Sequence, residues 1–297
     1  MTIFMQLLLA GIMIGIVYGV IAVGFVIVYK ASGIFNLAQG ELVAIGAFIA
    51  WQLLNPFGLH PVLVIFLVLA AAFAIGWLLS IFPFKPVLGQ SMFTLFTVSL
   101  ALMIFLRGLV ISIWSANEIR YFRPLQDDLP FFSPAPLRFG ELAIYRQDIL
   151  GFGLATILLL AFWAFFKYSR TGLAFRAVSE NSHIAQSLGI SLSKITALAL
   201  AIGAMVAALG GVILGLKYGI TVYVADLGLA ALAAVLIGGL ESITGAIIGG
   251  LIIGIVFSMS TYYIGHSIGD VAAFIVMIAV LFVRPHGLFG QKRIERV

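Results

Sequence analysis

The sequence predicts an all-α polytopic membrane protein with about eight or nine transmembrane or half-spanning helices. Hydrophobic residues make up 63% of the chain and charged residues only 9%, so there is too little polar surface to cover a soluble globule. Apolar runs of the ~20 residues that cross a bilayer recur from end to end. Backbone amides in lipid must be paired within each run, and weak polar/apolar alternation argues against a β-barrel.

Nine apolar segments follow from the hydropathy and from the positions of glycine and proline. They cover residues 7–29, 37–54, 62–82, 92–114, 149–168, 195–216, 223–240, 243–264 and 271–283, and together they form one transmembrane domain over residues 1–297. The first run is too long for the core of a signal peptide, and we expect it to be retained. The short, glycine-rich segments fit either close helix packing or broken helices that line a pathway.

The distribution of lysine and arginine predicts the orientation in the membrane. One side receives the polar segment 172–193 together with Lys30, Lys85, Lys167, Arg170, Arg176, Lys194, Arg284, Lys292, Arg293 and Arg296. The other side keeps the loop 115–147, where basic and acidic residues balance. We therefore expect the polar segment and the C-terminus in the cytoplasm and the N-terminus outside. The pI of about 9.6 then reflects topology, with no nucleic acid as a partner.

Two polar segments interrupt the apolar pattern. Residues 115–147 are rich in proline and form an external loop with a short hairpin, either a solvated connector or a docking surface. Residues 172–193 are amphipathic at a helical period, which predicts one short surface helix that follows Gly172 and stops at Gly189. That helix either anchors the loop at the interface or offers its polar side to a soluble protein.

The residue types exclude the common enzyme classes. The chain holds no Gly-x-x-x-x-Gly-Lys-Ser/Thr phosphate loop, no His-Glu-x-x-His and no Gly-x-Ser-x-Gly. Its four histidines are scattered, and there is no cysteine. We expect no catalytic residues, no metal site and no cofactor bound by this chain. An intramembrane enzyme is the one enzymatic alternative left open.

Four stretches carry a family resemblance that extends over nearly the whole chain. They are GIVYGVIAVGFVIVYKASGIFNLAQGELVAIGAF near the start, GLAFRAVSENSHIAQSLGISLSKITALALAIGAMVAALGGVILG in the middle, VLIGGLESITGAIIGGLIIGIV in the second half and RPHGLFG at the end. In this order they resemble the LivH-type permeases of branched-chain amino acid ABC importers.

The resemblance implies a membrane subunit that forms the translocation path but does not hydrolyse ATP. Its expected partners are a second permease of LivM type, two cytoplasmic ATPase subunits that hold ATP and Mg, an external binding protein that delivers the amino acid, and the bilayer of the bacterial inner membrane. By matching position, coupling to the ATPase is assigned to a cytoplasmic coupling helix with Arg176, Ala177, Ser179, Glu180, Asn181 and Gly189. Arg176 and Glu180 are also spaced to pair with each other.

Candidate path residues lie in two places. Asn36, Gln39 and Glu41 open the second apolar segment, and Gly239, Glu241, Ser242 and Gly245 interrupt the run between the seventh and eighth segments. An ionisable group at membrane depth is a functional hypothesis by default, and the alternative for Glu41 is an interfacial carboxylate near Lys30. The family often has His where Gln39 stands, and an amide cannot relay protons as His does.

Arg107 lies deep in the fourth apolar segment, where it needs a carboxylate or carbonyl partner or must reach the surface with its side chain. Asp226 and Asp270 are expected near outer helix ends. With Glu41 as the main intramembrane acid, an ion-gradient-driven secondary transporter is the alternative mechanism. A permease for amides, urea or aromatic acids is the alternative substrate class.

Overall fold

The computed structural model describes residues 2–115, 118–122, 136–139, 142–265 and 268–290, and it confirms the all-α prediction. In chain order the elements are α1 (Thr2–Ser32), α2 (Gln39–Leu54), α3 (Pro61–Leu79), η1 (Ser80–Phe84), η2 (Lys85–Val87), α4 (Met92–Trp114), β1 (Pro136–Phe139), β2 (Leu142–Tyr145), α6 (Arg146–Tyr168), α7 (Arg170–Glu180), α8 (Ser182–Ser187), α9 (Leu192–Tyr218), α10 (Tyr223–Gly238), α11 (Ile243–Tyr263) and α12 (Gly269–Val283). Six described helices are long and apolar enough to cross a membrane, and α2, α10 and α12 are shorter apolar helices.

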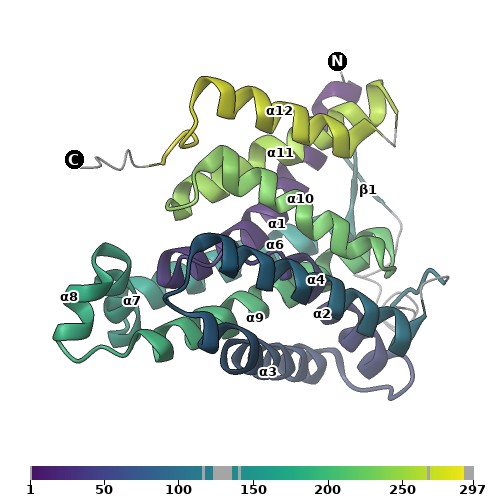
Figure 1. The fold of residues 1–297 in the computed structure, drawn as a ribbon. Coiled ribbons are helices and arrows are strands. Elements are labelled where there is room, and N and C mark those ends of the chain that lie inside the picture. The colour runs from purple at the N-terminus through teal and green to yellow at the C-terminus, as the bar shows by residue number, and fades with distance from the viewer. Residues whose placement is uncertain (1, 116–117, 123–135, 140–141, 266–267, 291–297) are drawn as a thin grey trace.

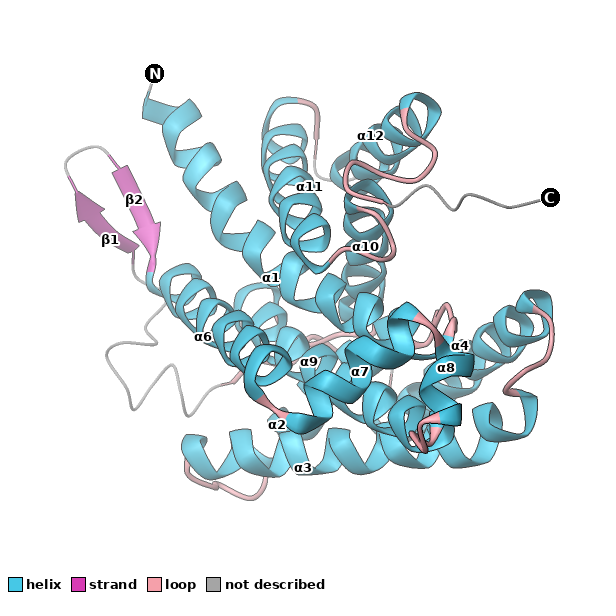
Figure 2. Ribbon diagram, turned by 90° about the vertical axis from the view of Figure 1, so that its left-hand side faces the viewer, coloured by secondary structure: helices cyan, strands magenta, loops and turns pink. Residues whose placement is uncertain are grey.

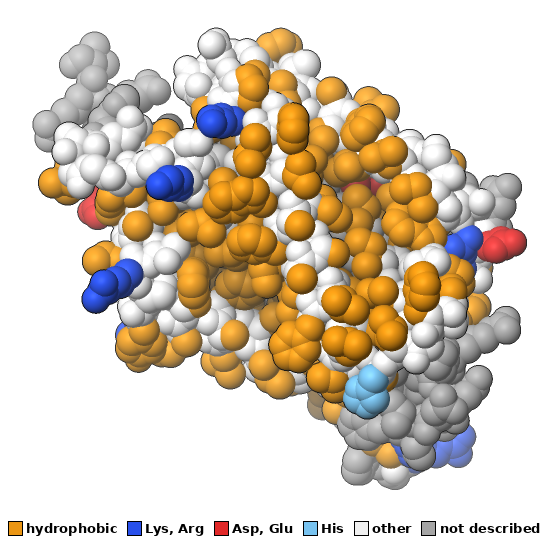
Figure 3. All heavy atoms as spheres, turned by 90° about the horizontal axis from the view of Figure 1, so that it is seen from below, with side chains coloured by type: hydrophobic (Ala, Val, Ile, Leu, Met, Phe, Trp, Pro, Cys, Tyr) orange, Lys and Arg blue, Asp and Glu red, His pale blue; other side chains and the backbone are white. Residues whose placement is uncertain are grey.

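Helices α1 and α9 form the centre of the bundle (Figures 1 and 2). In each, 83% of the most apolar stretch is buried, whereas the value is 22% for α3 and α4 and 11% for α6. Helix α1 packs against α6, α9, α10 and α11, and α9 packs against α2 and α3. The peripheral helices therefore turn apolar side chains outward, and Figure 3 shows such side chains covering the face seen from below. This surface is suited to hydrocarbon rather than water.

A stripe of glycines lets α1 and α11 pack closely. Gly11, Gly15 and Gly19 recur every four residues on α1, and a Cβ atom at Gly15 would lie 2.8 Å from the Cα of Leu251. Gly250 fits the same contact, since its Cβ would lie 2.5 Å from the Cα of Gly19. Helices in lipid associate through van der Waals packing of small residues, so this stripe positions α11 on α1.

Two helix ends differ from the prediction for identifiable backbone reasons. The segment predicted at 62–82 leaves α-helical geometry after Leu79, because Pro83 lacks an N–H and the amide of Lys85 instead reaches the carbonyl of Ser80 in a π-helical turn. Helix α2 starts at Gln39 rather than residue 37. Gly33, with φ +70°, ends α1 and begins a short non-helical connection.

The surface helix predicted in 172–193 is wrong as a single helix. It forms two helices, α7 and α8, because Asn181 adopts an extended conformation and its Oδ1 accepts a hydrogen bond from the amide of Ile184 (3.1 Å). An asparagine side chain competes in this way with continued helix and caps the next one. The predicted stop is confirmed: α8 ends at Ser187 and Gly189 has φ +85°.

The short hairpin expected in the loop 115–147 is confirmed by the antiparallel pair β1–β2, with Pro136 opposite Tyr145. Residues 116–117, 123–135 and 140–141 of this loop lie outside the described residues, as do the basic residues of the C-terminal tail from 291 onward. Elsewhere in the loop, Arg120 pairs with Ile220 in an isolated β-bridge and joins the loop to the end of α9.

The close packing at the glycine stripe predicts that even a glycine-to-alanine substitution in it lowers the stability of the protein. Gly15→Ala places a methyl group 2.8 Å from the backbone of α11, and overpacking of this kind costs about 1–3 kcal/mol. We expect a lower midpoint of thermal unfolding for the purified protein in detergent. The matched control is Gly153→Ala in α6, where a Cβ meets nothing within 4 Å. The control keeps or raises the midpoint, and equal losses in both variants would contradict the packing argument.

Candidate functional site

Helices α7 and α8 project from one end of the bundle, on the left in Figure 1. Ser169 caps the N-terminus of α7, since its Oγ accepts a hydrogen bond from the amide of Gly172 (2.8 Å). Phe175 and Val178 are buried, and the ring of Phe175 meets that of Phe166 edge to face at 5.4 Å. One side of α7 is thus held on α6, α1 and α9. The other side faces out from the bundle.

Most of the residues predicted for coupling lie at the surface of the molecule. Arg176, Glu180, Asn181 and Gly189 are exposed, and Ala177 and Ser179 are half-buried. The alternative of an Arg176–Glu180 pair is not realised, since no ion pair joins these two described residues. The carboxylate of Glu180 is therefore presented on the surface of α7.

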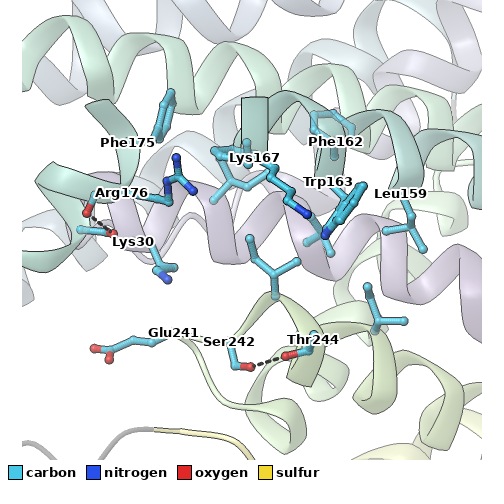
Figure 4. Close-up of a pocket in the computed structure, with 16 residues that line it drawn as sticks. Lys30, Leu159, Phe162, Trp163, Lys167, Phe175, Arg176, Glu241, Ser242 and Thr244 are labelled. Atoms are coloured by element: carbon cyan, nitrogen blue, oxygen red, sulfur yellow. Dashed lines mark hydrogen bonds between the residues drawn. The ribbon is translucent and has the colours of Figure 1, made fainter. Parts of the chain in front are cut away.

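A cavity of about 630 Å³ lies behind α7 and brings two predicted groups together (Figure 4). Its walls come from α1, α6, α7 and the turn between α10 and α11. Arg176 and Ser179 of the predicted coupling group and Glu241 and Ser242 of the predicted path group all line it. A second hollow of about 860 Å³ borders Glu180 and Asn181 as well as Glu241. Glu241 and Ser242 thus belong with the α7 end of the molecule.

Gly239 and Gly245 pack the turn between α10 and α11. Gly239 has φ +105°, which favours glycine, and a Cβ there would lie 2.7 Å from the amide nitrogen of Gly290. The chain after α12 folds back here, where Leu288 and Phe289 donate backbone hydrogen bonds to the carbonyls of Ile237 and Gly238 (2.8 and 3.0 Å). These glycines serve close backbone contact.

Asn36 and Gln39 are buried at the break between α1 and α2. The Nδ2 of Asn36 donates to the Oε1 of Gln39 (3.4 Å), and the Nε2 of Gln39 donates to the carbonyl of Gly203 on α9 (2.9 Å). Both side chains are less than 2% exposed. Their polar groups tie the broken helix to the bundle core, apart from the α7 end where Glu241 lies.

Three charged side chains from three helices meet around Arg107. Its Nε lies 2.8 Å from the Oε1 of Glu41 on α2, and its Nη2 lies 2.5 Å from the Oδ1 of Asp226 in the first turn of α10. Glu41 is completely buried, whereas the side chains of Arg107 and Asp226 are 33% and 44% exposed. The Oε2 of Glu41 has no hydrogen-bond partner among the described residues. A buried carboxylate is thus connected through Arg107 to a surface-accessible one.

The expected partner of Arg107 is confirmed as a carboxylate. The alternative of an interfacial carboxylate near Lys30 is wrong, because the Glu41 side chain is fully buried and pairs with Arg107. The role of Asp226 is the feature that the sequence reading missed. An acidic residue near the start of an apolar segment either lies at the membrane interface or pairs with a buried cation. An arginine without an obvious partner in another apolar segment favours the ion pair. Only the fold shows which arginine it meets.

The described residues hold no group of three or more histidine, cysteine, aspartate or glutamate side chains that could bind a metal ion. The charged cluster around Arg107 contains two carboxylates with the cation between them. It is therefore an ion-pair network.

Comparison with known proteins shows the family of this chain. Residues 7–281 match the family described as the permease component of branched-chain amino acid transport systems. LivH of Escherichia coli K12, a high-affinity branched-chain amino acid transport system permease protein, is 31% identical, with 99% of this chain and 98% of LivH covered. BraD of Pseudomonas aeruginosa, described in the same words, is 32% identical over the same shares of the two chains.

A solved structure supports the fold alone. PsaBC from Streptococcus pneumoniae in complex with Fab contains a chain that superposes with a TM-score of 0.50 at 16% identity, covering 95% of this chain and 92% of that one. The family match and the identity to LivH confirm the resemblance to LivH-type permeases over nearly the full length of the chain. The chain belongs to the family of permease components of branched-chain amino acid ABC transport systems, in which the ATPase activity resides in other subunits.

Proposed function

We propose that this chain forms one half of a translocation path for branched-chain amino acids in a bacterial inner membrane, and that α7–α8 couple it to cytoplasmic ATPases. The assembly consists of this chain, a second permease of LivM type, two ATPase subunits that hold ATP and Mg, and an external binding protein. The observation that carries the proposal is the exposed side of α7, which presents polar residues, Glu180 among them, at the basic end of an otherwise apolar bundle.

The basic end of the bundle supports the orientation. Lys30 and Lys167 lie in the last turns of α1 and α6, and both border the cavity behind α7. Lys85 lies in η2, shortly before the start of α4, and Lys194 lies in the first turn of α9. Short loops with an excess of lysine and arginine remain in the cytoplasm. The proposed topology therefore has α7 and α8 inside, and the start of α1 and the β1–β2 hairpin outside.

The cluster around Arg107 supports the position of the path. Arg107 lies roughly 10 Å from the Trp114 end of α4 at ~1.5 Å of rise per residue, within the depth of the hydrocarbon. Ile104 and Phe105 beside it are more than half exposed, so this face of α4 is open in the single chain. Exposed charges at this depth face a water-filled cavity or a protein partner rather than lipid. We assign this face to the path shared with the second permease.

The contacts of α7 suit it to couple the ATPase to the membrane helices. Its buried side contacts α6, α1 and α9, so a displacement of α7 by an ATPase also displaces the ends of these three helices. The α10–α11 turn with Glu241 and Ser242 closes the cavity behind it. Closure of the ATPase pair would move this end of the bundle as a unit and thereby switch the path between its inward and outward states.

Charge reversal on the exposed side of α7 tests the coupling. Glu180→Lys introduces a like-charge or unpaired contact against the ATPase groove, which costs several kcal/mol, and we expect ATP-driven leucine uptake to fall roughly tenfold or more. The assay uses proteoliposomes that contain the complete complex. Substrate-stimulated ATP hydrolysis falls in parallel.

The matched control is Glu118→Lys, because Glu118 is an exposed carboxylate in the loop at the opposite end and its ion pair with Arg120 is long (3.9 Å). This variant changes the net charge of the chain by the same amount. It keeps the normal coupling of uptake to ATP hydrolysis. Normal coupled uptake by Glu180→Lys would overturn the assignment of α7.

Neutralising the charge cluster separates a structural role from a path role. Arg107→Gln alone strands the buried carboxylate of Glu41 and lowers the free energy of unfolding by about 3 kcal/mol. The triple variant Glu41→Gln, Arg107→Gln, Asp226→Asn removes all three charges and recovers most of that stability. We expect its uptake to stay low, because the path has lost its charged surface.

Thermal unfolding and uptake are measured on the same preparations of the complete complex. A triple variant that is stable and transports at the normal rate shows that the cluster only fastens α2, α4 and α10 together. That result would remove this face from the path and leave the coupling assignment unaffected.

A further inference from the structure

The cavity behind α7 has an uncompensated positive rim. Lys30, Lys167 and Arg176 line it from three different helices, and Figure 4 shows Lys30 and Arg176 near one end and Lys167 turned toward Trp163. None of the three forms an ion pair in the described structure; the Nζ of Lys167 lies over the ring of Trp163 at 4.5 Å from its centroid. Glu241, on the turn that forms the opposite wall, is the one carboxylate among the lining residues. The cavity thus has a net positive charge that favours an anion.

The rest of the cavity is apolar and extends toward the membrane interior. Val23 of α1 and Leu159 of α6 lie roughly 10–13 Å from the basic ends of their helices at ~1.5 Å of rise per residue. Phe162, Trp163 and Phe166 continue this lining up to Lys167. Aromatic residues of this kind are enriched at the level of lipid headgroups. A charged rim above an apolar wall matches an amphiphile better than a small soluble anion.

We propose that this cavity binds an anionic phospholipid of the cytoplasmic leaflet. Its phosphate lies among Lys30, Lys167 and Arg176, and one acyl chain runs along the apolar wall formed by α1 and α6. The hydroxyl groups of Ser179, Ser242 and Thr244 line the same cavity and suit a headgroup that carries hydroxyls, such as glycerol. Basic pockets between membrane helices on the cytoplasmic side recognise anionic headgroups by this combination of contacts.

The test is native mass spectrometry of the full-length protein in mild detergent. Phosphatidylglycerol and phosphatidylcholine with identical acyl chains are titrated separately, and the dissociation constant of the first bound lipid is measured for each. We expect tighter binding of phosphatidylglycerol. Lys30→Gln and Lys167→Gln each weaken it about fivefold, as expected for one basic residue near a lipid surface, and leave phosphatidylcholine unchanged.

Two further variants control for charge and for folding. The double variant Lys85→Gln, Lys194→Gln removes two exposed lysines from the same end of the molecule but outside the cavity, and it keeps the preference. Thr244→Trp leaves every charge in place and fills the cavity from an exposed lining position, so it weakens binding of phosphatidylglycerol even if the lysine variants do not fold.

Three results would each overturn the proposal. Equal affinity of the unsubstituted protein for the two lipids removes the role of the rim. If the double variant of Lys85 and Lys194 loses as much affinity for phosphatidylglycerol, the preference depends on the overall charge of the protein and not on the cavity. Displacement of the lipid by free glycerol phosphate at similar concentration assigns the rim to a soluble anion. The readout is lipid binding, so failure here leaves the transport proposal standing.

Discussion

Helix α1 is apolar on every side, and its contacts with α9 and α11 organise the molecule. No hydrophobic effect drives helices together within lipid, so their association depends on how closely the backbones approach. Glycines at four-residue intervals on α1 provide that approach toward α11. Once α1 is enclosed, α6 and α10 lie against its remaining sides, while α2 and α3 pack on α9. The central packing thus positions α2, α3, α6, α10 and α11.

The two short helices α2 and α10 are also joined directly to each other and, through charged side chains, to α4. Their first turns approach each other so closely that a Cβ at Gly40 would lie 2.6 Å from the carbonyl of Ala225. Arg107 on α4 then joins the carboxylates of Glu41 and Asp226 next to this contact. A charge inside the membrane is stable only with such partners. One of these carboxylates, Asp226, lies at the surface of the chain, on the face that we assign to the proposed path.

At the α7 end of the bundle, packing and charge are combined. Phe175 and Val178 fix one side of α7 on the bundle, and the other side carries Glu180, where we propose that an ATPase docks. Lys30, Lys167 and Arg176 line the cavity behind α7. In our proposals the same few cations contribute to the orientation in the membrane and to the contact with a lipid.

Composition and periodicity were sufficient for the membrane class, the nine apolar segments and the amphipathic segment before α9, because each depends on local sequence. The family followed from motifs that extend over the chain. Tertiary structure alone decided that Arg107 meets both Glu41 and Asp226, that Glu241 and Arg176 line the same cavity, and that Gly239 and Gly245 serve packing. These facts join residues far apart in the chain, and hydropathy carries no information on which helices become neighbours. The break between α7 and α8 at Asn181 depends on local sequence, but the prediction missed it. The amphipathic pattern continues across Asn181, although its side chain ends one helix and caps the next.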